Sequence, residues 1–247
     1  MATQENQEII KKVKEKKEFS QLPDSLIERV LKKEKADIKE TRALLRKYFT
    51  VFLTNKLLSG KLTSEEMLKK HISSQNRNYT ELYGEILRGN ETIIDIGAGV
   101  NGFSYSFMPK NTRYVAIEAT GQLVDLMNVY FEKEKFSAEA IHSDIFNLEE
   151  IIGIIKKHKK PRTILLFNVI DALEFFEKDY SKKLLAGIKE HLGPGERIVI
   201  SFPTQSLTGK TKFHTTRKWL LDFLGENFSI INTFEENGEK FIILEKK

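Results

Sequence analysis

One short stretch of the chain constrains its fold more than any other. In residues 93–104, IIDIGAGVNGFS, an apolar run leads into the pattern G-x-G-x-x-G from Gly97 to Gly102. A glycine turn after a strand lets the backbone approach a ligand closely, because glycine has no Cβ. The stretch therefore predicts a strand and a turn that together bind an adenosine-containing cofactor.

The order of segments after residue 91 predicts the rest of the architecture. Helical segments alternate with short apolar runs at 92–96, 113–118, 138–142, 163–168 and 197–202. Such alternation is typical of a parallel sheet with helices on both faces. The chain then ends in two strand-like runs around Asn237-Gly238, which is a strong hairpin signal. We expect an α/β, Rossmann-like sheet of the class I S-adenosylmethionine methyltransferase type with an antiparallel C-terminal hairpin.

The first third of the chain has a different character. Residues 1–88 show helical spacing of apolar side chains and are expected to form a helical subdomain ahead of a cofactor domain over 89–247. Residues 1–80 carry 18 basic and 11 acidic side chains, a net charge of +7, whereas the remainder carries −2. A basic segment suits contact with a polyanion such as RNA, and a solvated helical face is the alternative.

Composition excludes several classes of protein. The chain has no cysteine, so it has no disulfide, no thiolate nucleophile and no Cys-ligated zinc. Its five histidines are scattered without metal-ligand spacing, so we expect no metal. No apolar run reaches the roughly 18 residues of a membrane span, and the first twenty residues lack the apolar region of a secretory signal. A cytoplasmic monomer without membrane contact is expected.

Three acidic residues at successive strand ends indicate which cofactor the turn serves. Asp95 stands two residues before Gly97, Glu118 ends the second strand and Asp144 follows the third. Glu118 is placed to accept hydrogen bonds from ribose hydroxyls, and Asp144 to meet an adenine amino group. A pyrophosphate needs close approach of the backbone together with a helix N-terminus, whereas S-adenosyl-L-methionine has no phosphate and carries a sulfonium and an ammonium. The acids favour S-adenosyl-L-methionine over a nicotinamide dinucleotide.

Two further stretches resemble one enzyme family. HISSQNR at 71–77 resembles H-x-S-T-x-E-R, and VISFPTQSLTGK at 199–210 contains a match to S-F-P-x-x-S-L-x-G-[KR]. Both patterns occur in the aminoglycoside-resistance 16S rRNA (guanine-N7) methyltransferases of the Arm and Rmt type, which the chain resembles over most of its length. The resemblance implies methylation of N7 of a guanine in the decoding site of 16S rRNA in the small ribosomal subunit, with antibiotic resistance as a consequence.

The resemblance also assigns roles to residues. Arg77 would hold the methionine carboxylate of the cofactor, because a guanidinium can grip a carboxylate with two parallel hydrogen bonds. Asp95 and Gly97 would line the methionine end, Glu118 the ribose, and Asp144 with Ile145 the adenine. The N-terminal helices would dock on the small ribosomal subunit. The complete set of cofactor-binding candidates is Arg77, Asp95, Gly97, Ala98, Gly99, Glu118, Asp144, Ile145 and Asn168.

The chemistry at guanine N7 explains why no catalytic base is expected. The N7 lone pair lies in the plane of the ring and no proton has to leave before attack, so positioning can carry the catalysis. Extruding the base and stacking it on an aromatic ring would fit this picture. The candidates at the reaction centre are Phe202, Ser201 and Asn168. The candidates for RNA contact are Lys32, Lys33, Lys210, Lys212, Arg217 and Lys218.

Departures from the family pattern leave the target nucleotide open. Asn101-Gly102-Phe103 stands where the family has N-P-L, and Asn76 stands where it has a glutamate. A methyltransferase for another RNA, a protein or a small molecule therefore stays an alternative, as does a non-catalytic RNA-binding module.

Overall fold

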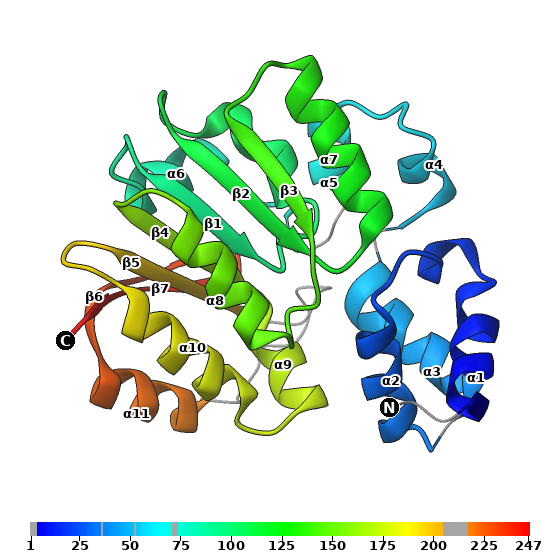
Figure 1. Ribbon diagram of the computed structural model, residues 1–247. Coiled ribbons are helices and arrows are strands. Elements are labelled where there is room, and N and C mark those ends of the chain that lie inside the picture. Colours follow the sequence, from blue (N-terminus) through cyan, green and yellow to red (C-terminus); the bar gives the residue numbers. More distant parts are fainter. Residues whose placement is uncertain (1–3, 36, 52, 71–73, 205–216) are drawn as a thin grey trace.

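A mixed sheet lies at the centre of the computed structural model (Figure 1), which describes residues 4–35, 37–51, 53–70, 74–204 and 217–247. The seven strands follow the order β3-β2-β1-β4-β5-β7-β6. The first five are parallel, and β7 runs antiparallel to both of its neighbours. The strands are β1 (Thr92–Ile96), β2 (Arg113–Glu118), β3 (Ala138–His142), β4 (Arg162–Phe167), β5 (Arg197–Pro203), β6 (Phe228–Glu236) and β7 (Glu239–Lys246).

The predicted strands coincide with the observed parallel strands to within one residue at each end, and the hairpin turns at Asn237-Gly238. In β1, Ile94 faces one apolar core while Ile93 faces the other, because successive side chains of a strand point to opposite faces. Both faces are therefore covered, which is why the strands read as nearly continuous apolar runs. The expected α/β architecture with its antiparallel C-terminal hairpin is confirmed.

Two layers of helices cover the sheet (Figure 1). On the face of Ile93, the apolar core lies between the sheet and α5 (Ser64–Lys70), α6 (Tyr79–Ile86), the 3-10 helix η3 (Asn101–Phe107) and α7 (Gly121–Lys133). On the face of Ile94, it lies between the sheet and α8 (Leu148–Lys157), α9 (Ile170–Phe176), α10 (Tyr180–His191) and α11 (Lys218–Asn227). Helices α5 and α6, which the sequence assigns to the N-terminal subdomain, thus pack on the sheet.

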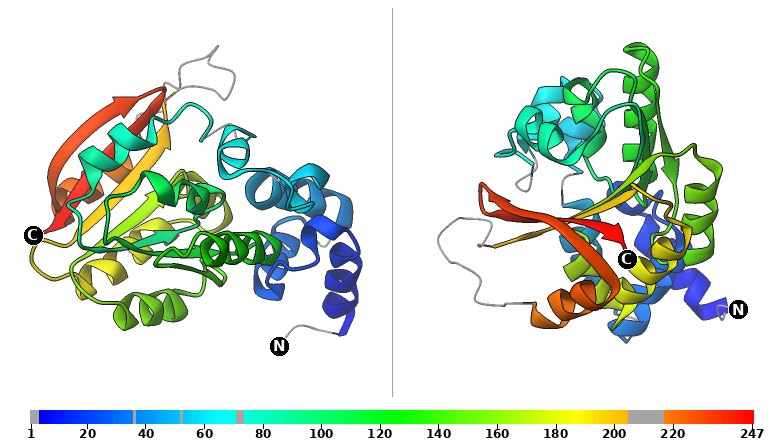
Figure 2. Two further views of the ribbon diagram at one scale, coloured as in Figure 1. Left: turned by 90° about the horizontal axis from the view of Figure 1, so that it is seen from above. Right: turned by 90° about the vertical axis from the view of Figure 1, so that its left-hand side faces the viewer.

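Most of the remaining helices form a group beside the carboxyl ends of the parallel strands, whereas α4 (Asn55–Leu58) packs on α7 (Figure 1). The C-terminal hairpin lies on the opposite side of the molecule (Figure 2). Arg29 of this group pairs with Glu177 and stacks 4.3 Å from the ring centre of Phe146. The elements of this group are α1 (Gln4–Lys14), η1 (Lys17–Phe19), α2 (Asp24–Lys33), α3 (Ile38–Leu45) and the π-helix η2 (Arg46–Thr50). None of the helices among the described residues is long and apolar enough to cross a membrane.

Candidate functional site

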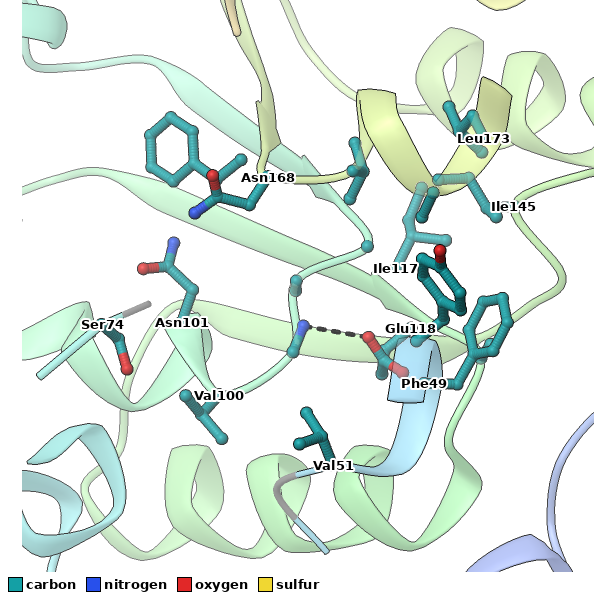
Figure 3. Close-up of a pocket in the computed structure, with 18 of the residues that line it drawn as sticks. Phe49, Val51, Ser74, Val100, Asn101, Ile117, Glu118, Ile145, Asn168 and Leu173 are labelled. Carbon is teal, nitrogen blue, oxygen red and sulfur yellow. Dashed lines mark hydrogen bonds between the residues drawn. The ribbon is translucent and has the colours of Figure 1, made fainter. Parts of the chain in front are cut away.

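A cavity lies at the carboxyl ends of β1, β2 and β4 (Figure 3). The strand order reverses between β1 and β4, and ligands of open α/β sheets bind at such a switch point. The cavity measures about 930 Å³, counted with the part that is open to solvent. Its walls come from the glycine turn, from the strand ends and from η2 of the N-terminal helices.

Two glycines of the turn stand where a Cβ would meet a neighbouring side chain. Gly97 has a φ of +74°, and a Cβ there would lie 2.5 Å from Cγ1 of Val169. A Cβ on Gly102 would lie 2.5 Å from Sδ of Met127 in α7. The first glycine therefore keeps the turn open toward the cavity, and the third lets η3 pack closely on α7.

Glu118 lines the cavity at the end of β2. Its Oε2 accepts a hydrogen bond from the Gly99 amide and its Oε1 one from the Thr120 amide, each at 2.9 Å. Burial raises the pKa of Glu118, although these amides oppose the rise. Each carboxylate oxygen keeps a second lone pair, so Glu118 can accept further bonds from ligand hydroxyls.

Asp95 is buried behind the cavity and is not among the residues that line it. Its Oδ2 accepts hydrogen bonds from Asn101 Nδ2 at 2.6 Å and from the Tyr114 hydroxyl at 2.7 Å, while Oδ1 has no partner among the described residues. Burial raises the pKa of Asp95 to about 6. The sequence suggested that Asp95 lines the cavity itself. Instead Asn101 lines it, and Asp95 acts on the cavity through the Asn101 amide.

Asp144 also differs from the expected placement. Both of its oxygens are engaged by the protein: Ser25 of α2 donates its hydroxyl at 2.6 Å, and the Phe146 amide donates at 3.0 Å. Its neighbours Ser143 and Ile145 line the cavity, but Asp144 itself does not. The N-terminal helices thus contact, through Ser25, the carboxylate that the sequence assigns to the adenine, and that carboxylate is not part of the cavity wall.

A polar cluster around Glu239, the first residue of β7, lies at the opposite end of the cavity, and its members Arg77 and Asn168 line the wall. Oε2 of Glu239 accepts from Arg77 Nε at 2.8 Å, and its Oε1 accepts from Arg77 Nη2 at 2.7 Å and from Asn168 Nδ2 at 2.9 Å. The Ser201 hydroxyl donates to the same Oε1. Burial alone would lower the pKa of Arg77, but the adjacent carboxylate raises it, so the guanidinium stays charged.

Sequence reasoning missed Glu239, although the sequence contained a signal for it. The hairpin at Asn237-Gly238 makes β7 antiparallel to β6. β7 also runs antiparallel to β5, and in the observed register Glu239 pairs with Pro203. The first residue of β7 therefore lies beside the carboxyl end of β5, where the other site residues gather.

Aromatic side chains of η2 form the wall near Glu118 (Figure 3). Tyr48 stacks on Phe175 with ring centres 4.8 Å apart, and Phe49 packs against Phe176 at 5.4 Å. The Phe49 carbonyl accepts a bond from the Thr120 hydroxyl at 3.3 Å, which fixes this segment to the end of β2. The sequence placed Tyr48 and Phe49 in an apolar helical stripe, and nothing in that stripe indicates that they reach a cavity.

Phe202 and Arg217 are engaged with each other away from the cavity. Phe202 is buried, with the Arg217 guanidinium 4.5 Å from its ring centre. Arg217 is also buried and donates two hydrogen bonds to Asp171, at 2.9 and 2.6 Å. Neither residue has the exposed position that base stacking or phosphate contact would need, because both are part of the packing between β5, α9 and α11.

The other candidates for RNA contact are lysines, of which Lys218 directly follows Arg217 at the start of α11. Lys32, Lys33 and Lys218 are exposed, and the Lys33 ammonium lies 4.3 Å from the ring centre of Phe175. Lys210 and Lys212 fall outside the described residues. Within the described part of the chain, no three His, Asp or Glu side chains gather in a way that could hold a metal ion.

Comparison with known proteins identifies the fold. The sequence matches no protein-family model and no curated protein sequence. The structure is similar to the 16S rRNA methyltransferase RmtF in complex with S-adenosyl-L-homocysteine, with a TM-score of 0.76 at 17% identity over the whole of both chains. It is also similar to the 16S rRNA methylase RmtB, with a TM-score of 0.74 at 14% identity over the whole of both chains. An rRNA methylase from Escherichia coli gives 0.72 at 15% identity over 98% of this chain and all of that one. The chain therefore has the class I methyltransferase fold, and the resemblance seen in the motifs is confirmed for the fold.

Proposed function

We propose that this chain is an S-adenosylmethionine-dependent methyltransferase that modifies N7 of a guanine in the decoding site of 16S rRNA. The observation that carries the proposal is the match to RmtF, a 16S rRNA methyltransferase, because it extends over the whole of both chains. The match thus includes the N-terminal helices and is not limited to the common sheet. The motifs at 71–77 and 199–210 support the same family independently.

The residues of the cavity fit S-adenosyl-L-methionine. Arg77 offers a buried cation to the methionine carboxylate, and Glu118 offers free lone pairs to the ribose hydroxyls. Phe49 and Ile145 supply apolar walls for the adenine. A Cβ on Gly97 would fill part of the space at the turn.

The reaction needs positioning more than acid–base chemistry. When bound, S-adenosyl-L-methionine supplies an electrophilic methyl group, which guanine N7 can accept without first losing a proton. The chain's contribution is to hold both partners in line and to exclude water. Asn168 suits this role because it lines the cavity and its hydrogen bond to Glu239 holds it in place. Ser201 is fully buried outside the cavity wall and acts only through its bond to Glu239.

The N-terminal helices are proposed to dock on the small subunit. Residues 1–80 carry the net charge of +7, and Lys32 and Lys33 are exposed in the last turn of α2. Lys33 also lies over Phe175, which packs against the aromatic wall of the cavity. RNA held by these lysines would therefore lie near the cofactor, and its binding would weaken with salt.

The direct test is transfer of a labelled methyl group from S-adenosyl-L-methionine to three substrates: assembled small ribosomal subunits, naked 16S rRNA and tRNA. Product would be mapped by borohydride reduction and aniline cleavage, which detect N7-methylguanine. We expect label in the small subunit and cleavage at one decoding-site guanine. Label in another RNA, or label without cleavage, would refute the assigned target and keep the methyltransferase.

A matched pair of variants tests the docking surface. Lys32→Glu/Lys33→Glu reverses two charges in the last turn of α2, and Lys156→Glu/Lys157→Glu does the same in the last turn of α8. Only the first pair should raise KM for the small subunit. It should also reduce the slope of log affinity against log salt concentration by about one unit for each phosphate that is no longer neutralised. Equal effects of both pairs would show that net charge acts without a defined surface.

A further inference from the structure

A buried carboxylate of the C-terminal hairpin connects three separate parts of the polar end of the cavity. Glu239 accepts hydrogen bonds from Arg77 before the first strand, from Asn168 after β4 and from Ser201 in β5. Its side chain is 9% exposed and that of Arg77 is 7% exposed. A carboxylate in this setting is costly unless its partners are complete, so the three donors are held firmly.

The contact with Glu239 determines which part of the guanidinium faces the cavity. Glu239 takes Nε and Nη2 of Arg77 in a two-point contact. Nη1 lies 3.5 Å from Asn101 Oδ1, at the limit of a hydrogen bond. The edge that a ligand carboxylate would otherwise grip is thus occupied, and Nη1, whose bond to Asn101 is long, is the end that Glu239 does not engage.

The same carboxylate determines the orientation of the Asn168 amide. A carboxylate oxygen only accepts, so the Asn168 NH₂ group must face Glu239, and it does so at 2.9 Å. The amide oxygen of Asn168 is buried and makes no hydrogen bond within the described residues. Arg77 and Asn168 donate to the same Glu239 oxygen and both line the cavity, so a cationic donor lies next to an amide whose oxygen has no partner among the described residues.

A neighbouring donor and acceptor match the two charged groups of an α-amino acid. The carboxylate of the amino acid can accept from Arg77, and its ammonium can donate to the Asn168 oxygen. We propose that Glu239 is a positioning residue that arranges Arg77 and Asn168 to recognise the amino-acid part of the ligand. This inference rests on the proposed function, in which that part is the methionine of S-adenosyl-L-methionine.

The chain contains a natural control for this role. Arg162 and Glu196 form a second buried two-point pair, with distances of 2.7 and 2.8 Å. That pair lies at the amino ends of β4 and β5, opposite the end where the cavity opens. Loss of either pair removes a buried ion pair, but only the Glu239 pair touches the ligand-binding wall.

The test compares two ligands that differ only in the amino-acid part. S-adenosylhomocysteine contains it, whereas 5′-methylthioadenosine keeps the adenosine and the thioether without it. Calorimetry would give both affinities for the wild type, Glu239→Gln and Glu196→Gln. Glu239→Gln should weaken S-adenosylhomocysteine by about tenfold or more, because hydrogen bonds of a charged group are removed. Its affinity for methylthioadenosine should change by less than about twofold, as should both affinities of Glu196→Gln.

A second variant keeps the test decisive if Glu239→Gln does not fold. Glu239→Asp retains the charge but withdraws it by one methylene, so Arg77 no longer has its two-point partner, and a smaller loss confined to S-adenosylhomocysteine is expected. Equal weakening of both ligands, or no weakening of either, would overturn the positioning role. A wild type that binds neither ligand would instead overturn the proposed function, and the inference with it.

Discussion

The two ends of the cavity are built in different ways (Figure 3). At the Asn168 end, charged and polar side chains from the strand ends are tied together by hydrogen bonds to Glu239. At the Glu118 end, aromatic side chains from η2 pack against α9 and complete the wall. One end therefore depends on electrostatics within the sheet, and the other on how the N-terminal helices are attached to it.

This difference explains how one fold can combine a common cofactor with a particular substrate. The polar end is determined by sheet topology, which brings the carboxyl ends of β4 and β5 next to the amino end of β7. The apolar end is supplied by the helical segment that we propose to dock on RNA. A change in the attachment of that segment would alter the cofactor site directly, because Phe49 and Val51 are part of its wall.

The largest expected effect comes from removing the cation of the polar end. Arg77→Ala should reduce affinity for S-adenosylhomocysteine by about a hundredfold. It should also lower the free energy of unfolding by about 3–5 kcal/mol, because Glu239 is left buried and unpaired. In Arg77→Ala/Glu239→Ala stability should recover while affinity does not. Urea unfolding and calorimetry would measure both, and a double variant as unstable as Arg77→Ala would contradict this explanation.

The next effect concerns Asp95, which supports the polar end through Asn101. Its pKa is raised from 3.8 to about 6 by burial, so between these values the folded state binds more protons than the unfolded state. The free energy of unfolding contributed by this group therefore falls as pH rises through that window. Asp95→Asn removes the group, so its stability relative to the wild type should increase from pH 4 to pH 7 by up to about 3 kcal/mol.

Urea unfolding at several pH values would measure this difference. Asp125→Asn, an exposed position on α7, controls for the loss of one negative charge. A stability difference that does not change with pH, or that falls as pH rises, would show that burial does not raise the pKa of Asp95.

A smaller effect is expected at the apolar end. Phe49→Ala should weaken S-adenosylhomocysteine and methylthioadenosine equally, by about three- to tenfold, because aromatic contacts contribute on the order of 1 kcal/mol. Phe223→Ala removes a partly buried ring of α11 far from the cavity and should leave both affinities unchanged. Weakening of S-adenosylhomocysteine alone by Phe49→Ala would break the distinction between the two ends.

The smallest effect tests the attachment of the N-terminal helices. Ser25→Ala removes the hydroxyl that donates to Asp144. It should cost about 1 kcal/mol of stability, the usual value of one hydrogen bond, and weaken both ligands equally and slightly. Thermal unfolding and calorimetry would measure it, and a large, ligand-selective loss would mean that Asp144 contacts the ligand.

The comparison of the two ends also shows what the sequence could predict. The strands, the glycine turn and the hairpin were predicted correctly, because each depends on a local pattern of apolar residues, glycines or Asn-Gly. The placement of Glu118 in the cavity wall follows in the same way, since it ends a strand next to the turn.

Contacts between distant segments could not be predicted in this way. Asp144 is engaged by Ser25, 119 residues away, and Arg77 by Glu239, 162 residues away. No local pattern indicates that Phe202 is covered by Arg217, or that η2 forms a wall of the cavity. These placements depend on how the N-terminal helices and the hairpin pack on the sheet, and local periodicity carries no information about that.

The most direct test of the cofactor assignment is a calorimetric titration of the wild-type chain with S-adenosylhomocysteine and, separately, with NAD. The glycine turn fits the pattern of a dinucleotide site, whereas Glu118 and the Arg77–Glu239 cluster favour an adenosine joined to an amino acid. We predict one site that binds S-adenosylhomocysteine and no measurable binding of NAD. Binding of NAD that is tighter than that of S-adenosylhomocysteine would contradict the cofactor assignment.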